Sequence, residues 1–125
     1  MVYHNIYDSW SWVGGHADGD DDLLHVSLKE ASEETGLKNV IPLSKDIFSL
    51  EVLGVDGQKE GYISTHIHLN ITYLLCANEN DITHIKEDEN SDVKWFELEE
   101  AIKASSEPHM KKIYNKLNNK LKNLK

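Results

Sequence analysis

The feature that most constrains the fold is a helical segment, residues 23–35, whose start and end are both marked in the sequence. Three aspartates at positions 20–22 precede it and favour the positive end of a helix dipole. Gly36 follows it, and glycine readily adopts the left-handed backbone conformation that ends many helices. One stripe of the helix must be buried against another element, and it consists of Leu24, Leu28, Ala31 and Thr35.

Predicted strands and helices alternate along the rest of the chain. Polar and apolar residues alternate over residues 8–13, which predicts a short strand ending at Gly14-Gly15. Further predicted strands cover residues 47–55, with an Asp56-Gly57 turn after them, 62–77 and 93–97. Predicted helices cover residues 98–104 and 107–124, the second with an apolar face of Met110, Ile113, Tyr114, Leu117 and Leu121. The pattern predicts one α/β (α+β) domain over residues 1–125 with a mixed sheet.

Composition excludes some classes of protein. No apolar run reaches the roughly 18–20 residues that a membrane span needs. The first ten residues have no basic start and no long apolar stretch, so they do not resemble a secretory signal. Cys76 is the only cysteine and lies in an apolar run, so we expect a buried thiol and no disulfide within the chain. These features indicate a cytoplasmic protein.

The net charge of −9 is unevenly distributed. Residues 106–125 contain six lysines and one glutamate, so the rest of the chain is strongly acidic. An acidic body repels nucleic acid polymers and attracts divalent cations. We therefore interpret the lysines as the solvated face of the last helix and expect no stable nucleic-acid binding. The alternative is a protein that binds nucleic acid through the lysine-rich residues 106–125. It predicts steeply salt-dependent binding.

Three glutamates in the predicted helix are the informative residues. Glu30, Glu33 and Glu34 stand at i, i+3 and i+4, so they share one helix face beside the buried stripe. Like charges at these spacings repel, and Lys29 offsets only part of that repulsion. Oxygen ligands favour a hard cation such as Mg²⁺ or Mn²⁺. From spacing alone, a solvated acidic face explains the pattern equally well.

The wider pattern resembles the Nudix box. Gly15 matches the opening glycine of that motif, and residues 29–37, KEASEETGL, match its close at every spacing. Asp21 stands where the family has its first glutamate, and Lys29 stands where it has arginine. Lysine lacks the bidentate fork of arginine, so these departures bear on efficiency, whereas the three helix acids are intact.

The resemblance covers nearly the whole chain, from Tyr3 to the last helix. GGHADGD, HIHLNITYLL and DENSDVKWFELEE look like segments of a bacterial Nudix subgroup. In that family a further acid often precedes a Trp-containing strand, and Glu89 is preferred here over Glu87 and Asp92. A solvated acidic loop is the alternative for each of them. The resemblance implies an α/β/α sandwich, and because the box comes so early, we expect that one or more N-terminal strands of the full domain are lacking.

The resemblance also implies an activity, namely Mg²⁺-dependent hydrolysis of a diphosphate linkage in a nucleoside diphosphate derivative or a related small molecule. It makes Glu33 and Glu34 principal metal ligands and Glu30 a ligand or the general base, with Glu89 as a further ligand and an equally open choice of base. Gly15 and His16 would form the mouth of the site, and Lys29 would steady a helix glutamate. The rival interpretation is a non-catalytic Nudix-like module that binds a nucleotide or another ligand.

Other candidate sites are weaker. Residues 18–22 look like a calcium loop, but Leu23 and Lys29 occupy the positions that need glycine and glutamate. His66 and His68 share a strand face, yet no third zinc ligand is evident, so lining of the substrate cleft or packing is preferred.

The tryptophans and the partners are less constrained by the sequence. Core packing is preferred over base stacking for Trp10, Trp12 and Trp95. Neither the substrate nor the oligomeric state, with a homodimer as one option, follows from the sequence.

Overall fold

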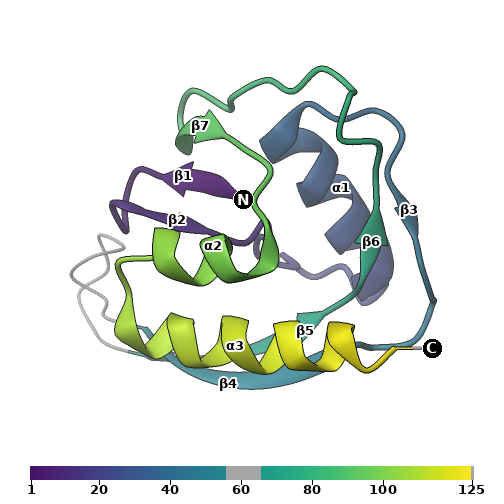
Figure 1. The fold of residues 1–125 in the computed structure, drawn as a ribbon. Coiled ribbons are helices and arrows are strands. Elements are labelled where there is room, and N and C mark those ends of the chain that lie inside the picture. Colours follow the sequence, from purple (N-terminus) through teal and green to yellow (C-terminus); the bar gives the residue numbers. More distant parts are fainter. Residues whose placement is uncertain (56–65, 125) are drawn as a thin grey trace.

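The structure is a computed structural model that describes residues 1–55 and 66–124 (Figure 1). Its helices are α1 (Leu23–Thr35), α2 (Leu98–Ala104) and α3 (Pro108–Lys122). Its strands are β1 (Val2–His4), β2 (Ser9–Ser11), β3 (Ile41–Pro42), β4 (Ser49–Val55), β5 (His66–Thr72), β6 (Leu75–Cys76) and β7 (Asn90–Val93). The predicted α+β class is confirmed, but the expected mixed sheet is not observed among the described residues, whose strand pairs are all antiparallel.

The first sheet has the order β2-β1-β7. Strand β2 lies inside the predicted strand 8–13, whereas β1 was not predicted. Tyr3 pairs with Trp10 across the two strands, and the Trp10 ring packs edge-on against Tyr3 and Phe96 at 5.5 and 5.0 Å. Trp12 packs likewise against Tyr114, so both tryptophans pack against other rings as expected, while Trp95 is exposed.

The predicted strand at residues 93–97 is wrong in position, because β7 ends where that strand was expected to begin. Asn90 starts β7 early. Its buried side chain accepts a hydrogen bond from the Lys86 backbone N–H and donates one to the Glu34 carbonyl. After β7 the chain turns to begin α2, for which Glu97 is the N-cap.

Strands β4 and β5 form an antiparallel ribbon whose register runs from Ser49 opposite Thr72 to Val55 opposite His66. The predicted strand at 62–77 is not continuous, because β5 ends at Thr72 and β6 pairs separately with β3. Residues 62–65 of that prediction, and the Asp56-Gly57 turn, lie outside the described residues.

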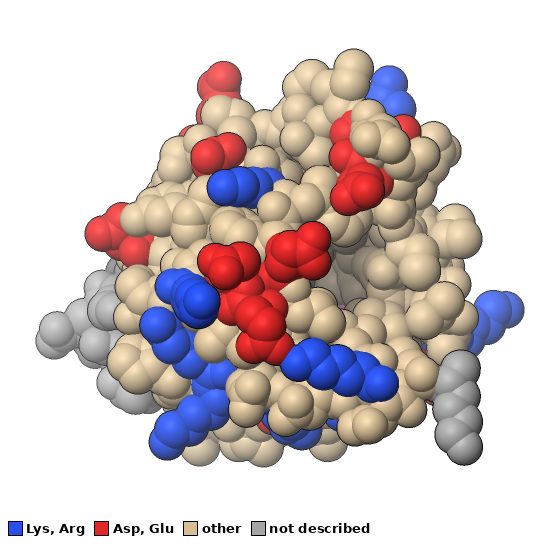
Figure 2. All heavy atoms as spheres, in the orientation of Figure 1, with Lys and Arg blue, Asp and Glu red and all other residues tan. Residues whose placement is uncertain are grey.

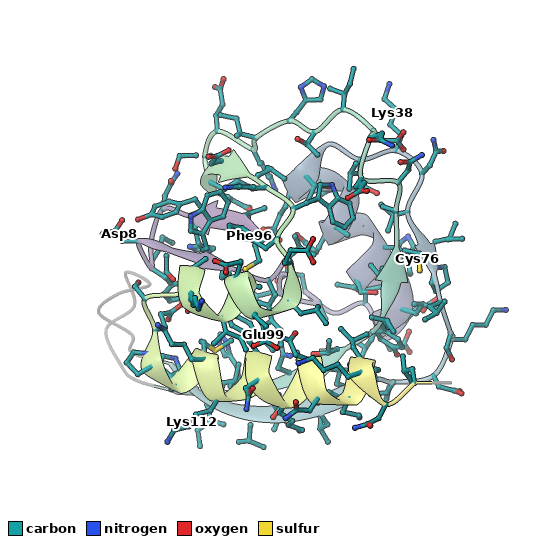
Figure 3. The ribbon with its side chains drawn as sticks, viewed as in Figure 1. Asp8, Lys38, Cys76, Phe96, Glu99 and Lys112 are labelled. Atoms are coloured by element: carbon teal, nitrogen blue, oxygen red, sulfur yellow. The ribbon has the colours of Figure 1, made fainter. Side chains whose placement is uncertain are left out.

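The expected burial of Cys76 is wrong. Cys76 is exposed on β6, at the edge of the molecule in Figure 3. It pairs with Ile41, which is exposed as well, because β3 and β6 form a two-stranded sheet with no third strand among the described residues. An apolar run therefore does not mark the core here.

Helix α1 has the predicted bounds and the predicted ends. The Asp22 side chain caps its start by accepting a hydrogen bond from the His25 N–H, and Gly36 ends it with a left-handed φ of 75°. Ala31 and Thr35 are buried as expected, whereas Leu24 and Leu28 are half-buried.

Helices α2 and α3 also match their predictions to within two residues at each end. They lie side by side, joined by a hydrogen bond of 2.7 Å from the Asn118 side chain to the Leu98 carbonyl (Figure 1). Met110 and Tyr114 supply the buried part of the expected apolar face of α3. None of the helices in the described part of the chain combines the length and the hydropathy of a membrane-spanning segment.

Candidate active site

Three carboxylates from two separate elements meet beside α1. Glu30 and Glu34 are one turn apart on α1, and Glu89 comes from the turn that precedes β7. One oxygen of each side chain lies within 4.8 Å of the others. We call Glu30, Glu34 and Glu89 the acidic cluster. Of the three acids considered before the Trp95 segment, the structure brings Glu89 into this cluster.

Glu34 is the buried member, with only 2% of its surface exposed. Its carboxylate accepts a hydrogen bond of 2.8 Å from the Gly14 backbone N–H. Burial raises the pKa of Glu34 to about 7, the hydrogen bond from Gly14 opposes that rise, and the charges of Glu89 and Glu30 add to it. A carboxyl group held in this way is costly to ionise unless a cation is present.

Gly15 lies directly against the Glu30 carboxylate. A Cβ atom at this position would lie 2.5 Å from the carboxyl carbon of Glu30, so no other residue fits without moving that side chain. The backbone at residues 14–15 therefore contacts both helix acids of the cluster. Burial, and then the charge of Glu33, raises the pKa of Glu30.

Lys86 was not anticipated from the sequence. Its ammonium group lies 2.9 Å from Glu89 and 3.8 Å from Glu33, and the hydrogen bond to Glu89 raises the pKa of Lys86. Lys86 is the single lysine in the acidic stretch 79–92, and this isolation is the signal that could have identified it. It places one positive charge beside the acids.

Lys29 does not hold a helix glutamate by direct contact. Its side chain is exposed and acts on Glu30 only through its charge, which lowers the pKa of that carboxyl group. Within the described residues Lys86, rather than Lys29, makes the ion pairs with the acids of the site.

The other predicted site residues lie around this cluster. Glu33 is exposed and reaches Lys86 from the outer side of α1, so its role as a metal ligand stays a prediction. The exposed His16 ring lies 5.2 Å from the His68 ring, in an edge-on arrangement. The side chain of His66 lies outside the described residues, and zinc binding by the pair has no further support.

The donor set fits a hard divalent cation. All three groups of the acidic cluster offer oxygen, the ligand type that Mg²⁺ and Mn²⁺ prefer. A divalent ion would also offset the mutual repulsion and the burial that raise the pKa values of Glu30 and Glu34. A solvated acidic face would not show the burial that raises the pKa values of Glu30 and Glu34.

Comparison with known families agrees with this geometry. A family model described as the NUDIX domain matches residues 3–117, which include the acidic cluster, the glycines and Lys86. A search of curated proteins finds no match to the chain. Because the family match spans most of the sequence, the chain belongs to the Nudix family.

Proposed function

We propose that the chain is a metal-dependent Nudix hydrolase that cleaves a diphosphate linkage in a nucleoside diphosphate derivative or a related small molecule. The observation that carries this proposal is the convergence of Glu30, Glu34 and Glu89, with Glu34 held by the Gly14 N–H. Substrates of this kind carry negative oxygens that repel an attacking water. A protein that hydrolyses them needs a cation at the linkage.

Each residue of the acidic cluster has a part in this proposal. Glu34 and Glu89, together with Glu30 or Glu33, would hold Mg²⁺ or Mn²⁺, which neutralises the diphosphate and makes a water easier to deprotonate. Attack of that water on one phosphorus would form a new P–O bond and break the bond from that phosphorus to the bridging oxygen. The other phosphate group would depart with the bridging oxygen, and the linkage would become two separate phosphate groups. A carboxylate must accept the proton of the water.

Glu30 and Glu89 are the two candidates for that base, and the contacts favour Glu30. Lys86 is hydrogen-bonded to Glu89, whereas Glu30 has no ion pair within the described residues and its pKa is raised. A carboxylate with a raised pKa is a stronger base near neutral pH. Glu30→Gln should therefore lower kcat more than it weakens metal binding, and Glu89→Gln should do the reverse.

Gly15 and His16 mark the expected mouth of the site. Gly15 lets the backbone approach Glu30, and His16 projects next to His68 of β5. Imidazole groups at this position suit contacts with phosphate or with a ring beyond the diphosphate. We assign them to substrate binding and not to the chemical step.

A substrate screen tests the proposal. Nucleoside triphosphates, nucleotide sugars, dinucleotide cofactors and dinucleoside polyphosphates are incubated with the chain and Mg²⁺, with Mn²⁺, or with chelator, and the products are separated by chromatography. We expect cleavage of at least one class with metal and none with chelator. Saturable binding of a nucleotide without cleavage would instead identify a non-catalytic binding module, and the hydrolase proposal would be abandoned.

A further inference from the structure

The outer face of the β4–β5 ribbon is apolar and faces water. In the register of the two strands Leu50 is opposite Ile71, Val52 is opposite Leu69, and Gly54 is opposite Ile67. Side chains of directly opposite residues share one face of a sheet, so these residues form one surface. We call this surface, Leu50, Val52, Ile67, Leu69 and Ile71 with Gly54, the apolar ribbon face. Four of its side chains are between 59% and 76% exposed, and they are Leu50, Val52, Ile67 and Leu69.

The other face of the same ribbon carries its polar side chains together with Leu53, and it already has a neighbour. Ser49 is buried there, and Glu51 accepts a hydrogen bond of 2.8 Å from Lys116 of α3. Helix α3 lies along β4 and β5 on this side (Figure 1). A ribbon with one covered face normally turns its apolar side chains toward the cover. Here the more polar of the two faces is covered, so the apolar ribbon face is left for another partner.

The chemistry of this face selects the partner. It contains no charged side chain, so it offers nothing specific to a nucleic acid, a phosphorylated peptide or an acidic protein. Single exposed aliphatic residues are ordinary, but a contiguous set on adjacent strands indicates an interface. Its best complement is a second apolar surface of the same shape, which a two-fold pair of identical chains supplies.

The area is sufficient for such a pair. Burial of one aliphatic side chain removes roughly 60–120 Å² from water, judged from its transfer free energy and the usual energy per unit area. The five side chains of the apolar ribbon face therefore bury about 500 Å² per copy and about 1,000 Å² in the pair, which is near the lower limit for specific interfaces. A two-stranded ribbon is only marginally stable alone, so stacking two ribbons also stabilises each of them.

We propose that two copies of this chain associate through the apolar ribbon face, with the β4–β5 ribbons stacked about a two-fold axis. Each copy carries a net charge of −9, so long-range repulsion opposes association. Added salt screens that repulsion. The dimer should therefore tighten as the salt concentration rises, whereas a contact between the lysine-rich helix of one copy and the acidic surface of another would weaken. The acidic surface that such a contact would use is seen in Figure 2, where acidic side chains gather over α2.

Sedimentation velocity on the full chain, at protein concentrations from about 1 to 200 µM, tests the proposal because a small interface implies micromolar affinity. We expect a reversible monomer–dimer equilibrium for the native sequence and a higher dimer fraction at higher salt. Leu69→Asp should abolish the dimer, and Val52→Lys, on the neighbouring strand, should do the same. Ile82→Asp is the matched control, because Ile82 is 77% exposed but lies outside the ribbon, between β6 and β7.

Circular dichroism of each variant separates loss of association from loss of folding, and the two ribbon variants provide independent readings. Three outcomes would overturn the proposal. One is a native chain that stays monomeric up to the highest concentration. Another is a dimer that survives both folded ribbon variants, or that Ile82→Asp removes equally. The third is an association that weakens as salt is added.

Discussion

The acidic cluster and the apolar ribbon face differ from ordinary protein surfaces in opposite ways. Glu34 is an acid with 2% of its surface exposed, whereas Leu69 is an aliphatic residue with 76% exposed. In the first region the backbone of Gly14 and the side chain of Lys86 hold charged groups in place. In the second, the register of two strands holds apolar groups in water.

Unfavourable burial of charge and unfavourable exposure of apolar side chains point to two different kinds of ligand. Charge repulsion beside α1 is relieved by a cation, and hydration of the ribbon is relieved by another apolar surface. Either ligand binds only the folded chain, so each should raise the apparent stability as its concentration rises. Substitutions that affect one region and not the other can therefore show whether the two regions act independently.

The largest effect is expected from Glu34→Gln. Glutamine keeps an oxygen that can accept the Gly14 N–H, but it removes the charge that the metal needs. We expect turnover to fall about a thousandfold, because a bound cation contributes several kcal/mol to such reactions. The measurement is the Mg²⁺-dependent rate on the best substrate of the screen, and Glu87→Gln, exposed and outside the acidic cluster, is the control. Near-normal turnover of Glu34→Gln would place the site elsewhere.

The next effect is a pH dependence of the metal-free chain. The pKa of Glu34 is about 7 in the folded chain and near its ordinary value of 4.5 in the unfolded chain. Between these values the folded state binds the extra proton, so stability falls as the pH rises through this window. The loss is at most about 3 kcal/mol.

Urea unfolding in excess chelator, at several pH values across that window, measures the loss. Glu34→Gln should flatten the profile, and saturating Mg²⁺ should reverse the trend in the native chain because the metal binds the ionised form. A native profile as flat as that of the variant would show that the burial of Glu34 does not disfavour its charge.

A matched glycine pair tests the approach of the backbone to the acidic cluster. Gly15→Ala places a Cβ atom 2.5 Å from the Glu30 carboxylate, whereas a Cβ atom at Gly14 has no neighbour within 4 Å. Neither glycine has a positive φ, so alanine does not strain the backbone at either position. We expect Gly15→Ala to lower kcat about tenfold to a hundredfold by displacing Glu30, with Gly14→Ala close to native. Equal effects would mean that Gly15 serves the loop and not the site.

A smaller effect is expected from Lys86→Met. The Lys86 ammonium group competes with a bound cation for Glu89, so its removal should tighten Mg²⁺ and Mn²⁺ binding about threefold to tenfold at moderate salt. Isothermal titration calorimetry measures this change. Lys29→Met is the control, because its exposed side chain acts on Glu30 only through its charge. Weaker metal binding by Lys86→Met would show that Lys86 positions Glu89 for the metal.

The sequence predicted the parts of the molecule whose signals are local. The bounds of α1 follow from the Asp22 cap and from Gly36, and the pairing of Glu30 with Glu34 follows from helical spacing. Glu89 was found only because the family pattern points to it. Its approach to α1 depends on the Asn90 side chain, which accepts a hydrogen bond from the Lys86 N–H and donates one to the carbonyl of Glu34, 56 positions earlier in the sequence. Helical or strand periodicity does not predict such a contact.

Predictions that depend on tertiary packing were wrong or missing. Cys76 lies in an apolar stretch that predicts burial, yet it is exposed, because burial requires a second layer that the local pattern does not specify. Lys86 was missed for a related reason. A lone lysine in an acidic loop acquires meaning only when the fold brings Glu33 and Glu89 to it.

The smallest effect is expected from Leu69→Thr at protein concentrations where the chain is monomeric. Leu69 is mostly in water there, and threonine keeps a good strand propensity, so the free energy of unfolding should change by less than about 0.5 kcal/mol. Met110→Ala, at a buried position of α3, should instead cost about 2–5 kcal/mol. Urea unfolding followed by circular dichroism measures both.

The same pair of variants at high protein concentration separates the two sources of stability. The native chain should gain stability with concentration while Leu69→Thr gains less, because the weakened face no longer couples folding to association. Met110→Ala should show the same dependence on protein concentration as the native chain, but its free energy of unfolding should be lower at every concentration. A loss above about 1 kcal/mol for Leu69→Thr in the dilute monomer would mean that Leu69 is packed within a single chain, since an exposed substitution does not reach that size.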